Sequence, residues 1–329
     1  MESNNNLGTT LVPQTEADTN QPSQLQRNPF ILGNTVEVDL QTLQDQYLVP
    51  VFSRDNVETI SHYEFINTVC DAVQTHFAGQ QFNTPVVRCS HEMKLRTKAG
   101  AGRFNPNDDC GSYMQRMMFA IEIPSIQRTI NGNTLYLQVV GVRTYSETNL
   151  LGNSAQKQCF RIALGFVNLC CTNTLVRSDG SNLNIKVTNT ADLYDSAMSL
   201  FSRYDYDQHL KEIEHLTEVQ IDVPTLAQFL GRCKMYQQMT NSQRNALHLP
   251  EFILPEAQLN AFIRDYYTDE NFGGFGREIT AYQLYQLLTN YKNNYIDVAL
   301  ERSINCYETA LGLSLAIKHE DDSWNWFIS

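Results

Sequence analysis

Residues 159–187, CFRIALGFVNLCCTNTLVRSDGSNLNIKV, constrain the fold more than any other stretch of the chain. Apolar side chains alternate along its first half, at Phe160, Ile162, Leu164 and Phe166. A period of two is typical of a half-buried β-strand. Asp179-Gly180 is a common signal for a two-residue hairpin turn. A turn at this dipeptide predicts a returning strand over residues 183–188 and keeps one face apolar across both strands.

Residues 117–144 repeat this pattern. Alternating apolar side chains lead to Asn131-Gly132, a second hairpin signal, and an apolar strand returns after it. Pro124 lies inside the first strand, where its missing N–H predicts an edge position or a bulge. The two segments therefore predict two hairpins of a mostly antiparallel sheet with at least four strands.

The sheet is expected to have a polar face as well as an apolar one. If each hairpin pairs without interruption from its turn, the side chains that point away from the apolar face are those of Glu122, Arg143, Arg161, Asn173, Asn184 and Lys186. Small residues lie among them, and small residues let a backbone or a flat ligand approach closely. The alternative is an ordinary solvated face of an antiparallel sheet.

Helices are predicted on both sides of these strands. Ser61 and Glu64 form a capping box that opens an amphipathic helix, and Gly79 ends it. Residues 191–216 have apolar side chains at helical spacing, with His209 and His215 expected on the helix surface.

The last third of the chain is predicted to be helical. Pro224 and Pro255 are suited to the first turns of two helices, and Thr280 is suited to capping a third. A long helix is expected over residues 295–317, and the aromatic end after it is expected to dock on the body.

Together these patterns predict an α+β fold, in which a mostly antiparallel sheet of at least four strands packs with helices and a helical half follows. The expected organisation is a disordered tail over residues 1–35, a sheet core over residues 36–216 and a helical region over residues 217–329 that packs on the core. The tail is rich in Asn, Gln and Thr and has few large apolar residues.

Composition limits the class of protein. The chain has 329 residues and a formal net charge of −12, which opposes coating of duplex DNA by bulk charge. The eight cysteines lack metal-ligand spacing. No signal peptide or membrane-spanning run is present, so reduced thiols in a cytoplasmic protein are expected, with no metal, no other cofactor and no membrane partner.

One segment is basic in this acidic chain. Residues 84–104 contain a single acid, Glu92, among the cations and histidine Arg88, His91, Lys94, Arg96, Lys98 and Arg103. Such a strip can neutralise phosphates, and Arg143, Arg161 and Lys186 on the polar sheet face extend the candidate nucleic-acid-binding set.

Two further patterns are candidate sites. The loop that contains Asp269, Glu270, Gly273, Gly274, Gly276 and Arg277 could cradle an anion, although it also fits a simple helix connection. Asp71 followed by Glu92 and Lys94 loosely matches the acids and lysine with which metal-dependent nucleases hold Mg²⁺. The sequence otherwise offers no catalytic constellation, and no catalytic residue is assigned.

Several segments together resemble a known family. These are SRDNVETISHYEFI, RMMFAIEIPSI, ALGFVNLCCTNTLVRSDG, DENFGGFGREIT, YQLYQLLTNY and WFIS, in this order over residues 40–329. They resemble an uncharacterised domain-of-unknown-function family of bacterial conjugative elements and prophages, which is similar to the "phage/plasmid-like protein" family. The resemblance implies a protein encoded by mobile DNA and brings no catalytic residues.

Three functions follow as expectations. The first is a non-catalytic accessory of DNA metabolism that binds or anneals single-stranded DNA. The second is an anti-defence protein, of anti-restriction or anti-CRISPR type, that binds a host defence or recombination enzyme through an acidic surface. The third is a metal-dependent nuclease. A homo-oligomer is compatible with each of them.

Overall fold

The structure, a computed structural model, describes most of the chain. The described residues are 31, 33–49, 59–96, 110–150, 157–168, 174–270, 272, 274, 276–289 and 295–329; for 95–96 and 148–150 only the backbone is described. Most of the predicted tail lies outside these ranges, as do Lys98, Arg103, Asn173 and Gly273. Ile31, which the predicted tail includes, is buried against the second face of the sheet.

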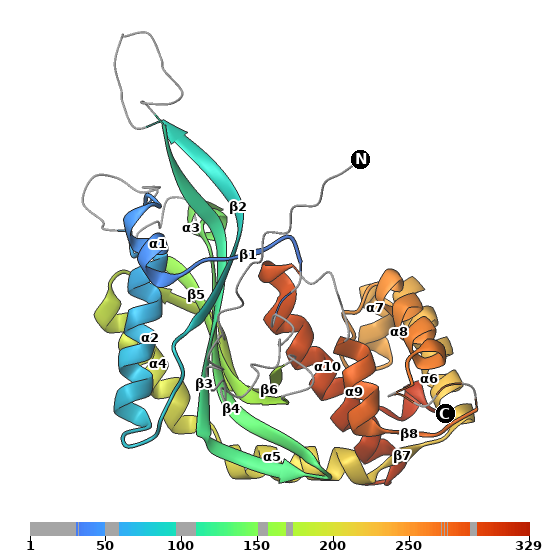
Figure 1. Cartoon of the computed structure of the whole chain (residues 1–329). Coiled ribbons are helices and arrows are strands. Elements are labelled where there is room, and N and C mark those ends of the chain that lie inside the picture. The colour runs from blue at the N-terminus through green and yellow to red at the C-terminus, as the bar shows by residue number, and fades with distance from the viewer. Residues whose placement is uncertain are drawn as a thin grey trace, which may run out of the picture.

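A six-stranded antiparallel sheet forms the centre of the molecule (Figure 1). The strands are β1 Val36–Glu37, β2 Val86–Arg96, β3 Cys110–Ile130, β4 Asn133–Thr144, β5 Gln158–Asn168 and β6 Thr174–Val187. They lie side by side in chain order, so each strand pairs with the next one in the sequence. The predicted antiparallel sheet, and with it the α+β class, is confirmed.

The β3–β4 hairpin confirms one predicted turn and one predicted bulge. Asn131 and Gly132 have φ values of 46° and 79°, the left-handed backbone that a two-residue turn of this kind requires. The register shifts between Ile123 and Gln127, so the segment that contains Pro124 bulges out of the ladder. The bulge carries three residues that have no partner on β4.

This bulge overturns the predicted position of Arg143. A shift of the register by an odd number of residues moves the side chains beyond it to the other face of the sheet. Arg143 therefore lies opposite Met117, on the face that was predicted to be apolar. The prediction was wrong because it carried the register of the turn unchanged past the bulge.

The β5–β6 hairpin has its turn elsewhere than predicted. Asp179-Gly180 lies inside β6, which continues from Thr174 to Val187, and the connection between the two strands falls on residues outside the described ranges. The register shifts between Ala163 and Gly165, so the dipeptide forms a bulge. Arg203 donates to the carbonyl oxygens of Asp179 and Ser181, at 3.2 and 2.6 Å, and so holds the bulge from the neighbouring helix.

Two helices cover the first face of the sheet. They are α2 (His62–His76), which the Ser61–Glu64 capping box opens as predicted, and α4 (Thr190–Arg203). Both lie on the same side of the sheet (Figure 1). Their apolar sides join the alternating residues of β3 to β6 in one core, which the short helix α1 (Leu40–Asp45) extends.

A single long helix, α10 (Ile296–Ile317), covers part of the second face. Ile296, Ala299 and Leu300 of this helix pack on Val142 and Ala163 of the sheet in a second core. This part of the sheet was expected to be polar and open, and it is instead buried. Ala163, one of the small residues predicted to admit a ligand, instead packs in the core that this helix completes.

The remaining helices build the carboxy-terminal half as predicted. They are α5 (Tyr206–Glu218), α6 (Val223–Gln238), α7 (Asn241–Ala246), α8 (Glu256–Thr268) and α9 (Ala281–Thr289), with α3 (Tyr145–Leu150) standing between β4 and β5. A two-stranded ladder, β7 (Gln220–Ile221) with β8 (Ile279–Thr280), ties the segment before α6 to the segment before α9. The last turn, Asn325–Phe327, buries Phe327 completely.

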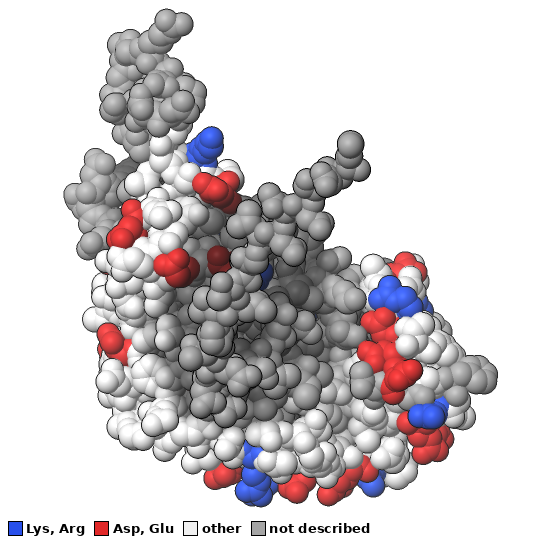
Figure 2. Space-filling model, in the orientation of Figure 1, with Lys and Arg blue, Asp and Glu red and all other residues white. Residues whose placement is uncertain are grey.

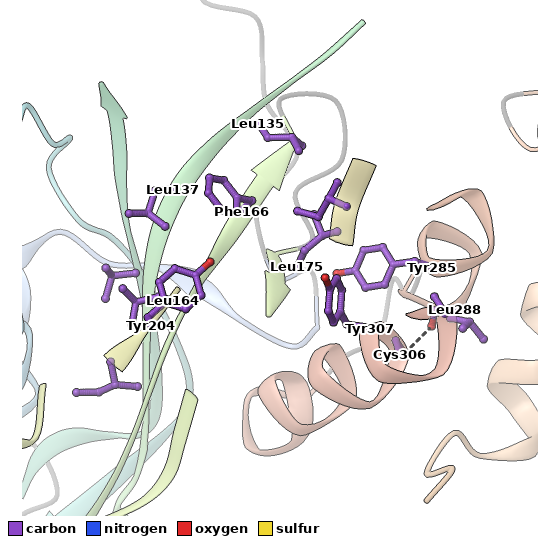
Figure 3. Close-up of a cluster of buried hydrophobic side chains, with 14 of the residues drawn as sticks. Leu135, Leu137, Leu164, Phe166, Leu175, Tyr204, Tyr285, Leu288, Cys306 and Tyr307 are labelled. Carbon is purple, nitrogen blue, oxygen red and sulfur yellow. Dashed lines mark hydrogen bonds between the residues drawn. The ribbon is translucent and has the colours of Figure 1, made fainter. Parts of the chain in front are cut away.

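The two halves share one apolar core. In Figure 3, Tyr285 of α9 and Tyr307 of α10 lie beside Leu175 of β6. The hydroxyl of Tyr285 donates to the carbonyl oxygen of Thr174 at 2.9 Å, so the contact is polar as well as apolar. His209 is fully buried in this region, hydrogen-bonded to the Tyr204 hydroxyl at 2.6 Å, and the prediction of a surface histidine was wrong.

The bulge at Gly180 leads to a stability prediction. A Cβ added at Gly180 would lie 2.8 Å from the Tyr204 ring and 2.9 Å from the carbonyl oxygen of Leu164. We expect Gly180→Ala to lower the free energy of unfolding by about 1–3 kcal/mol, as overpacking does. The control is Gly231→Ala in α6, where a Cβ meets nothing within 4 Å and where alanine should stabilise by about 0.5–1 kcal/mol. Urea unfolding measures the change in the free energy of unfolding for each variant. Equal changes in the two variants would contradict the close contacts at the Gly180 bulge.

Buried neutral histidines lead to a prediction about pH. Burial lowers the pKa of His62 and of His209 to about 3, with the positive charges of Arg143 and Arg177 acting in the same direction. The unfolded chain has the ordinary histidine pKa of about 6.5, so it binds more protons below that pH. Stability is therefore full above pH 6.5 and falls as the pH drops toward 3, by up to about 1.4 kcal/mol per pH unit for each histidine.

His209→Asn keeps a group that can bond the Tyr204 hydroxyl and removes the titration. Urea unfolding at pH 7.5 and at pH 5 measures how much free energy of unfolding is lost between the two pH values. This loss should be smaller for the variant than for wild type by about 2 kcal/mol. The exposed His248→Asn serves as the control and should lose as much as wild type. An unchanged pH dependence in His209→Asn would refute the assignment.

Candidate nucleic-acid interface

The β2–β3 arm, defined as Glu92–Arg96 of β2 with Cys110–Met114 of β3, is the part of the sheet that leaves the body (Figure 1). The pairing of β1 with β2 ends at Cys89, and the pairing of β3 with β4 starts at Arg116. Beyond these points the two strands pair with each other as a ribbon. The predicted basic strip runs along this ribbon and into the connection at its end.

The two flanks of the arm differ. On the β3 side, Tyr47 bridges to Ser112, and the N–H of Leu48 donates to the Ser112 carbonyl oxygen at 2.8 Å. On the edge of β2 that faces away from β3, no strand of the described chain pairs beyond Cys89. The side chains of residues 91–94 are exposed. Among the residues that the structure describes, this flank of β2 is therefore an unpaired sheet edge.

His91 marks the base of the arm. Its φ of 62° is left-handed, which a residue with a side chain seldom adopts within a strand. Its ring Nδ1 lies 2.9 Å from the Ser90 hydroxyl and 3.2 Å from Nη1 of Arg116, whose guanidinium can only donate. These contacts fix the imidazole beside the body. Among the arm residues whose side chains are described, Lys94 is the exposed cation.

Three of the predicted phosphate-binding residues are engaged within the protein. Arg88 donates to the Thr35 hydroxyl and carbonyl oxygens at 2.8 and 3.0 Å and lies 3.6 Å from a Glu37 carboxylate oxygen. Arg161 is bound in the network described below. Arg143 is 1 % exposed, which excludes contact with a nucleic acid in this structure.

Arg143 has a structural role instead. Its guanidinium lies 4.5 Å from the ring centroids of Tyr145 and Phe160 and donates to the Ile60 carbonyl oxygen and, at 2.6 Å, to Oε1 of Gln158. Burial lowers its pKa to about 10, so it still carries its charge at neutral pH. The aromatic faces and the two acceptors hold a buried cation that bonds no carboxylate among the described residues.

Lys186 is exposed but distant from the arm. It lies on β6, opposite Cys159, and β3, β4 and β5 separate that strand from β2. The structure therefore does not unite the sheet-face cations with the basic strip. Of the predicted set, it leaves Lys94 and Arg96 on the arm, with Lys98 and Arg103 in the connection outside the described residues.

The base of the arm is fixed by the Asp297 network, which consists of Arg116, Thr144, Glu147, Arg161 and Asp297. Nε of Arg116 lies 2.7 Å from one carboxylate oxygen of Asp297, and the Thr144 hydroxyl donates to the other at 2.7 Å. Arg161 donates to the backbone carbonyl oxygen of Asp297 at 2.7 Å and to Glu147 at 2.5 Å. Three strands, α3 and the start of α10 thus meet at one set of charges.

Electrostatics favours this arrangement at the start of α10. Asp297 lies in the first turn of the helix, where backbone N–H groups and the helix dipole favour a negative charge. Burial raises the pKa of Glu147, Arg161 opposes the shift, and Asp297 adds to it. Sequence reasoning missed the network, although an acid in the first turn of a predicted helix was a usable signal for Asp297.

The nuclease pattern finds no support in the geometry. Asp71 is exposed on α2, which covers the first face of the sheet, while Glu92 and Lys94 lie on the arm. Within the described ranges, no group of three or more His, Cys, Asp or Glu side chains could hold a metal ion. The cysteines whose side chains are described, six of the eight, are free thiols.

The 269–277 loop connects α8 to β8, as its simpler interpretation predicted. Gly274 and Gly276 have φ values of 78° and 80°, which favour glycine. The N–H of Gly274 donates to the Tyr266 carbonyl oxygen at 3.1 Å, and that of Arg277 donates to Gly274 at 3.3 Å. These two N–H groups are used within the chain and Phe272 is buried, whereas Gly273 lies outside the described residues, so the anion cradle stays a prediction.

Removal of one carboxylate tests the Asp297 network. Asp297→Asn leaves Arg116 half-buried without its counter-charge, and we expect a loss of about 1–3 kcal/mol in the free energy of unfolding. Asp195→Asn on α4 removes an exposed carboxylate as the matched control and should change stability by less than about 0.5 kcal/mol. Denaturant unfolding measures the free energy of unfolding of both variants. Similar losses in the two variants would refute the stabilising role of the Asp297 network.

Comparisons with known proteins give a family and no activity. No curated protein and no solved structure matches the chain. No helix in the described part of the chain is long and apolar enough to cross a membrane. One family model matches residues 14–328, nearly the whole chain, and so includes the arm and the Asp297 network. The chain belongs to the family described as "Domain of unknown function, B. Theta Gene description (DUF3871)".

Proposed function

We propose that this protein binds single-stranded nucleic acid through the β2–β3 arm, as a non-catalytic accessory of DNA metabolism on mobile DNA. The observation that carries the proposal is the placement of the one basic segment of an acidic chain. The described part of that segment leads into an arm that leaves the body, and the exposed Lys94 and the strand position Arg96 lie on this arm. A two-stranded ribbon is narrow enough to lie along a nucleic-acid backbone.

The charge balance favours a single strand over a duplex. A net charge of −12 repels a duplex that would contact a broad surface, whereas an arm that stands away from the body separates its cations from most acids. Figure 2 shows a basic side chain on the arm close to an acidic one, while the rim over α5 to α8 carries both signs intermixed. Binding would rest on backbone phosphates, because few aromatic residues lie in the basic segment for stacking on bases.

Salt dependence of binding to a labelled oligothymidylate tests the proposal. We expect affinity at about 50 mM salt that weakens as salt rises, with a logarithmic slope near −0.7 for each phosphate contacted. Lys94→Ala/Arg96→Ala should reduce the slope by about 1.4, the value for two contacts. The control, Lys186→Ala/Lys211→Ala, removes two exposed cations away from the arm and should leave the slope unchanged. Wild-type protein without affinity at about 50 mM salt would refute the proposal.

An acidic surface favours a second candidate, the anti-defence protein. Residues 190–222, which include α4 and α5, contain eight acids and two cations. The acids that are exposed are Asp192, Asp195, Asp205, Asp207, Glu214, Glu218 and Asp222. Such a surface could occupy the DNA-binding site of a host enzyme. If so, the protein should displace a duplex oligonucleotide from that enzyme, and Asp205→Asn/Asp207→Asn/Glu214→Gln should not.

A further inference from the structure

The open edge of β2 is the feature that the proposed function leaves unexplained. Natural proteins usually cover such an edge or protect it, because its free N–H and C=O groups pair readily with another strand. β1 covers this edge only at Arg88 and Cys89. Beyond Cys89, the side chains of residues 91–94 are exposed, with Met93 45 % exposed between two charged residues.

The order of side chains along this edge is self-complementary. Glu92, Met93 and Lys94 follow one another as acid, apolar residue and base. When two such strands meet antiparallel with a two-fold axis at Met93, each Glu92 lies opposite the Lys94 of the other copy. Directly opposite residues of an antiparallel pair lie on the same face of the sheet, close enough to interact.

We infer that two copies of this chain associate through antiparallel pairing of their β2 edges, with the two-fold axis at Met93. The pairing joins two arms into a four-stranded ribbon and covers Met93 with its counterpart. It forms two identical Glu92–Lys94 pairs, as a symmetric interface requires. The left-handed backbone of His91 ends the straight part of the edge on each copy, so the ladder is short and the dimer is a weak one.

This charge pattern indicates that the partner of the β2 edge is a second copy of the chain. A strand of only acidic or only basic residues would repel its own copy, whereas the sequence Glu-Met-Lys attracts it in this one register. Figure 2 shows acidic and basic side chains next to each other on the arm, as the register requires. The inference does not depend on nucleic-acid binding and can hold or fail separately from it.

Charge reversal at the edge tests the dimer by sedimentation velocity over a concentration series without nucleic acid. Wild type should dimerise. Glu92→Lys and Lys94→Glu should each turn two attractive pairs into two repulsive ones and raise the dimer dissociation constant about tenfold or more. The double variant Glu92→Lys/Lys94→Glu restores both pairs with reversed polarity, so it should dimerise as wild type does. The controls Glu214→Lys and Lys211→Glu on α5 should leave dimerisation unchanged.

A second measurement locates the axis. Met93→Cys places two thiols opposite each other, and mild oxidation should then give a covalent dimer on a non-reducing gel, whereas wild-type protein with its native cysteines should not. Circular dichroism melting checks that each variant folds. A wild type that stays monomeric to about 100 μM, single reversals without effect, or a double reversal that fails to restore the dimer would each overturn the inference.

Discussion

The sheet has two apolar faces, and the need to cover both of them organises the molecule. Helices α2 and α4 cover one face, which alternation in the sequence makes apolar. The other face carries Met118, Val140 and Val142 and would be expensive to leave in water. Helix α10 covers this part of it, from almost the far end of the chain. The carboxy-terminal half is therefore attached to the sheet through the second core as well as through the core that the two halves share.

The Asp297 network sets where that helix meets the sheet. Apolar contacts are non-directional, so they favour burial without fixing one position along the strands. Arg116 and Arg161 each reach α10 from a different strand, and both bind Asp297, one through its carboxylate and the other through its backbone carbonyl. Charge-assisted hydrogen bonds of this kind depend on distance and direction, and we interpret them as the element that fixes the register of the helix on the sheet.

The sequence predicted the elements well and their registers poorly. The capping box at Ser61, the Asn131-Gly132 turn and the helix that starts after Tyr295 depend on local chemistry, which is legible in a few residues. The positions of Arg143 and of Asp179-Gly180 depend on bulges. A bulge changes the face of every residue beyond it, and no local pattern states how many residues it holds.

The candidate site was only partly accessible to sequence reasoning for a related reason. The basic strip is contiguous in the chain, so composition alone found it. The partners that engage Arg88 and Arg161 are separated from them in the sequence by many residues, and only the fold brings them together. The polar sheet face was predicted to be open because nothing in a strand pattern reveals which helix covers it.

Native-state hydrogen exchange, measured residue by residue as a function of denaturant, tests the central claim that α10 and the sheet form one cooperative unit. The account predicts that the slowest amides of α10 and those of β3, β4 and β5 exchange with the same free energy of opening, equal to that of global unfolding. The amides of the β2–β3 arm should exchange through a smaller, local opening. Exchange of α10 at a lower free energy, while the sheet stays protected, would contradict the account.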